Sequence, residues 1–280
     1  MKGITAFFRG VGIRNIKPTI YGWFFNFAFT IFIYYGYYKV FSIPAGNTLI
    51  NNAGGAKIST FTFLADILHH YKGSLPLVFS LAFVFTIGFQ LASIYISGGI
   101  YAVLVEKEKT SFTNLIASST QNFFGMLKIA LINLINFIAA LIIPIILLIL
   151  FFNIKPLYSD EAFIEVFFWV WVIITALFLT FSAAIYDFSR IFKLKEDKNI
   201  LYSFKKGIKF TFSNKLNILA IFVLYALSLV IIYLVYALVM GVVHHLLYVS
   251  LLFLVYQGFI IIRYYLKIVV IRAEIRLLSD

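Results

Sequence analysis

The chain has 280 residues, of which 62% are hydrophobic and 12% are charged. Charged residues average roughly 25% in soluble domains, so this composition excludes an ordinary soluble protein and indicates a membrane protein. The net charge is +12, and the absence of cysteine from the sequence excludes disulfides and thiolate chemistry.

Six apolar stretches are each long enough to cross a hydrocarbon core, which takes about 20 helical residues. In chain order they cover residues 20–41, 77–104, 124–152, 162–189, 216–240 and 246–271. The runs are continuous in Ile and Leu rather than alternating with polar residues, which excludes barrel strands. The sequence therefore predicts an all-α polytopic integral membrane protein, with six transmembrane helices arranged as three helical hairpins in one membrane domain over 1–280.

Basic residues are distributed unequally between the two sides of the predicted bundle. An even number of spans puts both termini on one side, with the loops after the second and fourth spans, and that side holds 19 of the 23 Lys and Arg residues. The other side holds Lys39, Lys57, Lys72 and Lys155. By the positive-inside rule, both termini face the cytoplasm of a bacterial inner membrane. The positive charge then faces anionic headgroups, and we expect no nucleic-acid partner.

A common layout precedes the first, third and fifth spans. An aromatic residue, Phe8, Phe112 or Phe204, is followed by a short polar or basic amphipathic turn and then by the span. The second and fourth spans also end similarly, in "SGGIY" and "SAAIY". We interpret this layout as three pseudo-repeats, each a cytoplasmic amphipathic elbow helix followed by a hairpin. The repeats cover residues 5–104, 110–190 and 202–275.

The third elbow has the pattern of a helix that lies in the membrane interface. Phe204, Ile208 and Phe212 recur at i, i+4 and i+8 and form one apolar face. Three basic residues flank this face: Lys205, Lys206 and Lys209. Each contributes about 1 kcal/mol near an anionic surface, so we expect this helix to contact membrane lipids through their anionic headgroups. A basic loop that docks a partner or has a regulatory role is the alternative.

Asp187 and Arg190 are spaced i, i+3 at the cytoplasmic end of the fourth span, close to the depth of Arg263 in the sixth. In a low-dielectric boundary, an ion pair among these groups would lock two hairpins together. A contact with a lipid phosphate or a substrate is the alternative.

Several uncharged polar and small residues lie within the predicted spans. The in-membrane amides include Gln90, Asn133, Asn136 and Gln257. Such side chains usually form hydrogen bonds between helices, and lining of a pore is the alternative. The small residues Gly98, Gly99, Ala183 and Ala184 predict close helix contacts.

All four histidines fall on the predicted outer side, as His69 and His70 and as His244 and His245. Asp66 precedes the first pair at a spacing that puts it on the same helix face. Imidazole and carboxylate ligands suit zinc or a similar ion. We expect polar residues at the membrane interface, and a metal site is the alternative.

The junction "IYDFSRIFKLKEDKNILYSFKKGIKFTFSNK" carries a resemblance through Asp187, Phe188 and Arg190 and the basic amphipathic run that follows. It resembles junctions in six-span bacterial membrane proteins, akin to the membrane domain of some glycerophosphodiester phosphodiesterases. The resemblance implies the six-helix plan. It implies no catalytic residue here, since the phosphodiesterase chemistry belongs to a soluble barrel domain that these residues do not contain.

The sequence has no glycine-rich phosphate loop, no G-x-S-x-G elbow, no H-E-x-x-H and no EF-hand loop. We therefore expect no enzymatic activity and no cofactor. The expected role is a membrane scaffold or accessory subunit of a membrane complex, with lipid contacts and membrane-protein partners. The alternative is a transporter or flippase-like carrier for a lipid or small amphiphile, and a membrane enzyme with a metal at the outer histidines is a third reading.

Overall fold

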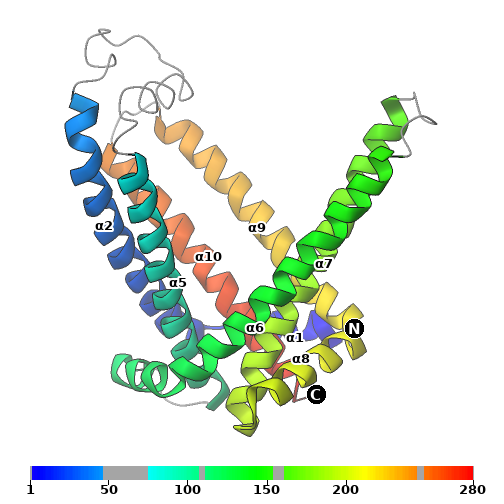
Figure 1. Ribbon diagram of the computed structural model, residues 1–280. Helices are drawn as coiled ribbons and strands as arrows, with labels where there is room; N and C mark the ends of the chain where they lie inside the picture. Colours follow the sequence, from blue (N-terminus) through cyan, green and yellow to red (C-terminus); the bar gives the residue numbers. More distant parts are fainter. Residues whose placement is uncertain (1, 47–74, 107–110, 154–160, 245–248, 280) are drawn as a thin grey trace. The chain divides into compact units, whose positions relative to one another are not determined.

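The computed structural model describes residues 2–46, 75–106, 111–153, 161–244 and 249–279, and all regular structure in these ranges is helical (Figure 1). This confirms the all-α prediction. The elements in chain order are α1 (Lys2–Gly10), the 3₁₀ turn η1 (Ile13–Asn15), α2 (Ile16–Gly46), α5 (Leu75–Glu106), α6 (Phe112–Asn153), α7 (Glu161–Glu196), α8 (Ile200–Ser213), α9 (Lys215–His244) and α10 (Val249–Leu277).

Five helices in the described part of the chain are long and apolar enough to cross a membrane. These segments are Phe83–Glu106 of α5, Phe112–Leu150 of α6, Glu165–Glu196 of α7, Lys215–Gly241 of α9 and Phe253–Leu277 of α10. They indicate a multi-pass membrane protein. The predicted first span lies within α2, a helix of 31 residues that is not among the five, so the sixth span stays a prediction.

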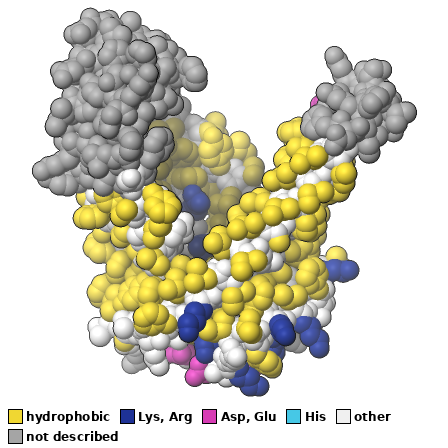
Figure 2. Space-filling model, in the orientation of Figure 1, with side chains coloured by type: hydrophobic (Ala, Val, Ile, Leu, Met, Phe, Trp, Pro, Cys, Tyr) yellow, Lys and Arg dark blue, Asp and Glu magenta, His cyan; other side chains and the backbone are white. Residues whose placement is uncertain are grey.

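Large apolar side chains are exposed along the outside of the long helices. Ile135 on α6, Ile173 on α7 and Leu238 on α9 all stand clear of the protein interior. Figure 2 shows hydrophobic side chains along the length of α6 and α7, while Lys and Arg gather toward the end where α7 meets α8. An apolar surface of this extent fits a helix that faces lipid.

The chain divides into two compact units. One comprises residues 1–23 and 94–280, and the other comprises Phe24–Ser93. In the second unit, aromatic rings join α2 to α5: Phe29 lies 5.8 Å from Phe89, and Phe32 lies 6.0 Å from Phe85, between ring centroids. The candidate functional site and the pocket discussed below lie in the first unit.

Two of the three predicted elbows are separate helices. The chain breaks between α1 and α2 at Gly12, where the backbone is extended, and between α8 and α9 at Asn214, which ends α8 with a non-helical backbone. The predicted second elbow is not separate, because α6 is one continuous helix from Phe112. No proline or chain-breaking turn follows Phe112 before Pro144, so nothing in the sequence ends the helix there.

The face of α8 that packs against the protein is made of small residues. Ser203, Gly207 and Thr211, at i, i+4 and i+8, are buried, whereas Phe212 is 56% exposed. A Cβ atom placed on Gly207 would lie 3.1 Å from the carbonyl oxygen of Ile185 on α7, so the two backbones approach closely. The apolar face predicted from sequence is therefore adjacent to the packed face, and Phe212 stacks on Phe181 of α7 at 5.9 Å.

The other elbow regions pack in the same manner. Gly10 on α1 is buried against α10, where an added Cβ would lie 2.7 Å from the carbonyl oxygen of Val269. At the start of α6, the carbonyl oxygen of Leu115 would lie 2.6 Å from a Cβ on Gly99 of α5. Thus α8 packs on α7, the start of α6 on α5, and α1 on α10. The arrangement as three elbow-and-hairpin repeats stays a prediction.

Gly207→Ala is expected to destabilise the protein, although alanine favours a helix by about 1 kcal/mol relative to glycine. The added methyl group would meet the Ser189 backbone nitrogen at 3.0 Å, and overpacking of this kind costs about 1–3 kcal/mol. Gly241→Ala in α9 is the matched control, since nothing lies within 4 Å of a Cβ there. Thermal unfolding in detergent should show a lower Tm for Gly207→Ala only. Equal Tm values for the two variants would contradict the close approach of α8 to α7.

Candidate functional site

The centre of the candidate site is Arg190 on α7, a charged side chain with a relative exposure of 2%. Its Nη2 donates a hydrogen bond to Ser97 Oγ on α5 at 2.7 Å, and its Nη1 lies 3.8 Å from Asp187 Oδ1. The guanidinium carbon lies over two tyrosine rings, 3.9 Å from the centroid of Tyr101 and 4.8 Å from that of Tyr186. Contacts of this kind stabilise a desolvated cation. We call these five residues the Arg190 cluster.

Asp187 is held by both helices of the cluster. The hydroxyl group of Tyr101 on α5 donates a hydrogen bond of 2.6 Å to Asp187 Oδ1, while Arg190 approaches the same oxygen from within α7. The two motifs that look alike in the sequence, "SGGIY" and "SAAIY", therefore supply Ser97, Tyr101 and Tyr186 to one site. The i, i+3 spacing of Asp187 and Arg190 brings them together as predicted, and the functional role of the pair stays a prediction.

Glu274 on α10 adjoins the cluster and was not predicted from the sequence. It is 1% exposed, and neither of its carboxylate oxygens has a hydrogen-bond partner among the described residues. The charges of Asp187, Arg190 and Lys267 all lie close enough to act on it. One sequence signal could have found it: Glu274 is the only acidic residue between Val249 and Leu277.

The predicted third member of the ion pair, Arg263, lies on an exposed position of α10. Lys267, four residues further along the same face of α10, is exposed as well, and its charge acts on Asp187. Neither residue forms an ion pair with Asp187 in the part of the chain that the structure describes. The role of Arg263 stays a prediction.

The cluster and Glu274 together act as a clamp between α5, α7 and α10. The positive charges of Arg190 and Lys267 both act on the two carboxyl groups, Asp187 and Glu274. Removing one partner of a buried pair leaves an uncompensated charge, which costs several kcal/mol. The arrangement therefore favours one relative position of the three helices.

Two of the predicted in-membrane amides, Asn136 and Gln257, form hydrogen bonds between helices. Asn136 Nδ2 on α6 donates to Asn133 Oδ1 at 3.2 Å and to Ser182 Oγ on α7 at 2.8 Å. Gln257 Oε1 on α10 accepts a hydrogen bond of 3.0 Å from Trp23 Nε1 on α2. Gln90 lies on an exposed position of α5.

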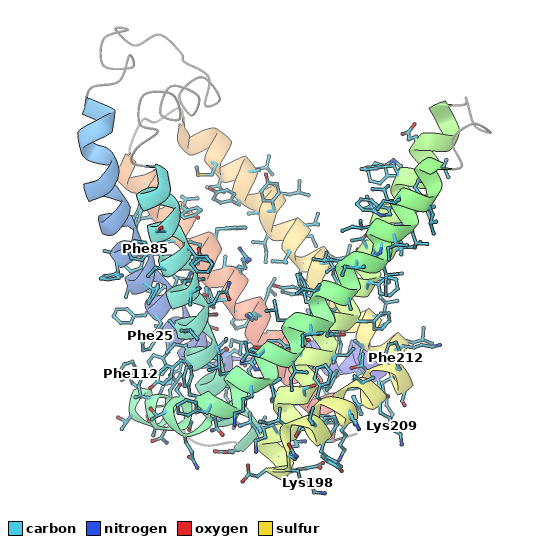
Figure 3. All side chains as sticks on the ribbon, in the orientation of Figure 1. Phe25, Phe85, Phe112, Lys198, Lys209 and Phe212 are labelled. Carbon is cyan, nitrogen blue, oxygen red and sulfur yellow. The ribbon has the colours of Figure 1, made fainter. Side chains whose placement is uncertain are left out.

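The lysines of α8 divide into two kinds. Lys205 and Lys209 are exposed, and Figure 3 shows Lys209 projecting from α8. Lys206 instead donates a hydrogen bond to Glu196 Oε1 at the end of α7, and this bond raises the pKa of the Lys206 ammonium group. Its ring neighbours Phe192 and Tyr202 add cation–π contacts at 4.8 Å and 5.8 Å.

The junction between α7 and α8 is closed by short-range contacts. Asp197 has a φ of 44°, the left-handed conformation that commonly ends a helix. Its carboxylate accepts a hydrogen bond of 2.7 Å from Lys193 Nζ, which lowers the pKa of Asp197. Asn199 then caps α8, where its Oδ1 accepts from the backbone N–H of Leu201.

The predicted metal ligands cannot be placed in the fold. Asp66, His69, His70 and His245 lie outside the described residues, as does the side chain of His244, which ends α9. The metal site stays a prediction.

Comparisons with protein-family models, with curated proteins and with solved structures give no match to this chain. The function proposed below therefore rests on the contacts and charges within the chain.

Proposed function

We propose that this chain is a non-enzymatic scaffold or accessory subunit of a membrane complex, with lipid contacts at its amphipathic elbows. We further propose six spans arranged as three hairpins in a bacterial inner membrane, with both termini in the cytoplasm. The helix plan suggested by the resemblance to six-span bacterial membrane proteins agrees with this proposal.

The observation that carries the proposal is the use of the polar groups inside the long helices. Asn136 bridges α6 to α7 through Ser182, and Trp171 Nε1 on α7 donates to the carbonyl oxygen of Pro144 on α6 at 2.8 Å. Gln257 and Arg190 likewise bond to neighbouring helices. A carrier needs polar groups that are available to its cargo, whereas a scaffold needs them to fix its helices.

The charged end supports the lipid contacts. In the first unit, both ends of the chain and the junction between α7 and α8 lie toward one end of the helices (Figure 1). Lys205, Lys209 and Phe212 are all exposed on α8 there, and Figure 3 labels Lys209 and Phe212 on this helix. Basic groups next to an exposed ring suit the boundary between headgroups and acyl chains.

A second candidate is a lipid or small-amphiphile carrier, and Glu274 favours it. A buried ionisable group in a span is a common marker of a transport pathway. Glu274 lies three residues before the end of the apolar segment Phe253–Leu277, however, and therefore away from the midplane where carriers usually bind their cargo.

The two candidates differ in what the purified chain does alone. We expect fluorescent phospholipids to move between the two leaflets of proteoliposomes no faster than they do in liposomes without protein. We also expect the chain to copurify with other membrane proteins when it is extracted from membranes without detergent exchange. Mass spectrometry should find these proteins in constant stoichiometry with the chain. Scrambling that disappears in the Asn133→Leu, Asn136→Leu double variant would contradict the scaffold and support the carrier. A chain that purifies alone under the mildest extraction would also contradict the scaffold.

A further inference from the structure

A pocket lined by four arginines lies where the loop after α1 meets the end of α10. Its volume is about 520 Å³, and its walls are formed by Arg9, Val11, Gly12, Ile13, Arg14, Arg272 and Arg276. Volumes of roughly 300–1,000 Å³ are usual for small-molecule sites. No acidic residue lines this pocket, so its charge is positive throughout.

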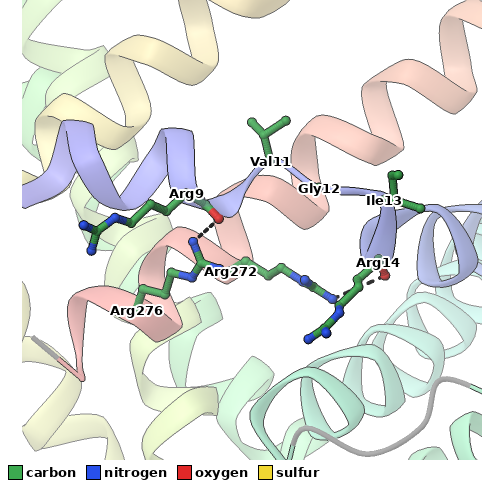
Figure 4. Close-up of a pocket in the computed structure, with 7 residues that line it drawn as sticks. All are labelled: Arg9, Val11, Gly12, Ile13, Arg14, Arg272 and Arg276. Carbon is green, nitrogen blue, oxygen red and sulfur yellow. Dashed lines mark hydrogen bonds between the residues drawn. The ribbon is translucent and has the colours of Figure 1, made fainter.

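The arginines are held in place by the backbone of the loop. Arg272 Nη2 donates to the carbonyl oxygen of Arg14 at 3.3 Å, and Arg276 Nη1 donates to the carbonyl oxygen of Arg9. Figure 4 shows Arg272 extending along the pocket toward Arg14, while the side chain of Arg9 points outward. Each bond uses one of the five N–H groups of a guanidinium, so further donors remain for a ligand.

The loop itself is fixed by two contacts, one partly buried and one buried. The backbone N–H of Gly12 donates to the Tyr265 hydroxyl group on α10 at 3.1 Å, and Asn15 Nδ2 donates to the carbonyl oxygen of Gly10 at 2.9 Å. The pocket is therefore built by α10 and the loop together.

Charge favours an anion in this pocket. The positive charges of Arg14 and Arg276 both act on Arg272, and no carboxylate of the pocket wall balances them. Glu274, which lies between Arg272 and Arg276 in the sequence, is buried. Guanidinium groups match the geometry of phosphate oxygens and bind them through paired hydrogen bonds.

We propose that the four-arginine pocket binds a phosphate group that carries a free terminal charge, as in a phosphomonoester. A lipid headgroup and a water-soluble phosphate share this chemistry. The neighbouring apolar side chains favour the lipid source: Ile13 is 85% exposed beside the arginines, and Val11 is also exposed. The site differs from the lysines of α8, and it does not depend on the scaffold role.

Phosphate binding is to be measured on the 280-residue chain in two experiments. In the first, nanodiscs contain phosphatidylcholine with phosphatidic acid or with phosphatidylserine at equal mole fraction, and bound lipid is quantified by native mass spectrometry. In the second, the Tm in neutral detergent is compared in sodium phosphate and in sodium chloride of equal ionic strength. We expect phosphatidic acid to bind in preference to phosphatidylserine. We expect the Arg14→Gln, Arg272→Gln double variant to lose at least about tenfold in affinity.

The control is Lys128→Gln, Lys215→Gln, which removes two exposed charges, one from α6 and one from α9, and should retain the binding. A pocket-dependent Tm shift with phosphate alone would assign a soluble ligand and support the site. Equal binding of the two lipids, equal loss in the control, or no binding in either experiment would overturn it. If the glutamine variant does not fold, Arg14→Lys, Arg272→Lys keeps the charge without the paired hydrogen bonds. Unchanged affinity in that variant would also overturn the proposal.

Discussion

Asp187→Ala is expected to lower the stability of the protein by less than the roughly 3–5 kcal/mol that breaking a fully buried pair costs, because the Asp187 side chain is 20% exposed. The substitution leaves Arg190, which is 2% exposed, without its nearest carboxylate, and it removes the acceptor of the Tyr101 hydroxyl group. Folded yield and Tm in detergent should both fall. The physical reason is that the guanidinium, which packs over the rings of Tyr101 and Tyr186, is left buried without this counter-charge.

The matched control is Asp197→Ala, at the end of the same helix. Asp197 also forms an ion pair, with Lys193, but its side chain is 95% exposed, so we expect only a small loss in Tm, which comes from the left-handed backbone that alanine tolerates less well than aspartate. Glu196 is less suitable as a control because it accepts a hydrogen bond from Lys206 on α8. Equal Tm values for Asp187→Ala and Asp197→Ala would contradict the clamp and would make a ligand role for Arg190 more attractive.

The sequence predicted the long helices well, because bilayer thickness sets their length. The apolar runs 124–152, 162–189 and 216–240 lie within α6, α7 and α9, and residues 249–271 of the last run lie within α10. Each helix extends past its predicted run at one or both ends. A helix does not have to end where the lipid ends, so the apolar run marks the lipid-facing part and caps mark the true ends.

Local spacing also predicted some contacts within a helix. The i, i+3 separation is enough to bring Asp187 close to Arg190, and the same separation brings Asn133 to Asn136. Contacts between helices needed the fold. Nothing in the sequence says that Ser97 and Tyr101 of α5 face Arg190, although the repeated "SGGIY" and "SAAIY" motifs marked the two segments involved.

Two features were beyond the sequence for physical reasons. Glu274 stands out as a lone acidic residue, but a long, mostly apolar helix gives no sign of which face is buried, so the sequence does not tell whether Glu274 faces the other helices or the membrane surface. On α8 the aromatic residues dominate the pattern, whereas the packed face consists of Ser203, Gly207 and Thr211. Small residues contribute little apolar area, and their role is visible only where two backbones approach.

Arg190→Gln is expected to be more damaging than Asp187→Ala. It removes the positive charge that faces both Asp187 and Glu274, and leaves the two carboxylates with Lys267 as the remaining cation that acts on both. Arg263→Gln is the matched control, because it makes the same chemical change at an exposed position of α10. We expect a large loss of folded yield and Tm for Arg190→Gln and a small change for Arg263→Gln.

Glu274→Gln should partly restore the Arg190→Gln variant, because it removes one of the two carboxylates that the missing guanidinium had balanced. In the unchanged protein the same substitution should have a small effect, since neither carboxylate oxygen of Glu274 has a hydrogen bond to lose among the described residues. A double-mutant cycle on Tm and folded yield measures the difference, and we expect a coupling of about 0.5–3 kcal/mol. If Glu274→Gln has the same effect in the unchanged protein and in the Arg190→Gln variant, the charge of Glu274 does not interact with that of Arg190. The clamp would then consist of α5 and α7 alone, and the buried carboxylate of α10 would need a partner from outside the described residues.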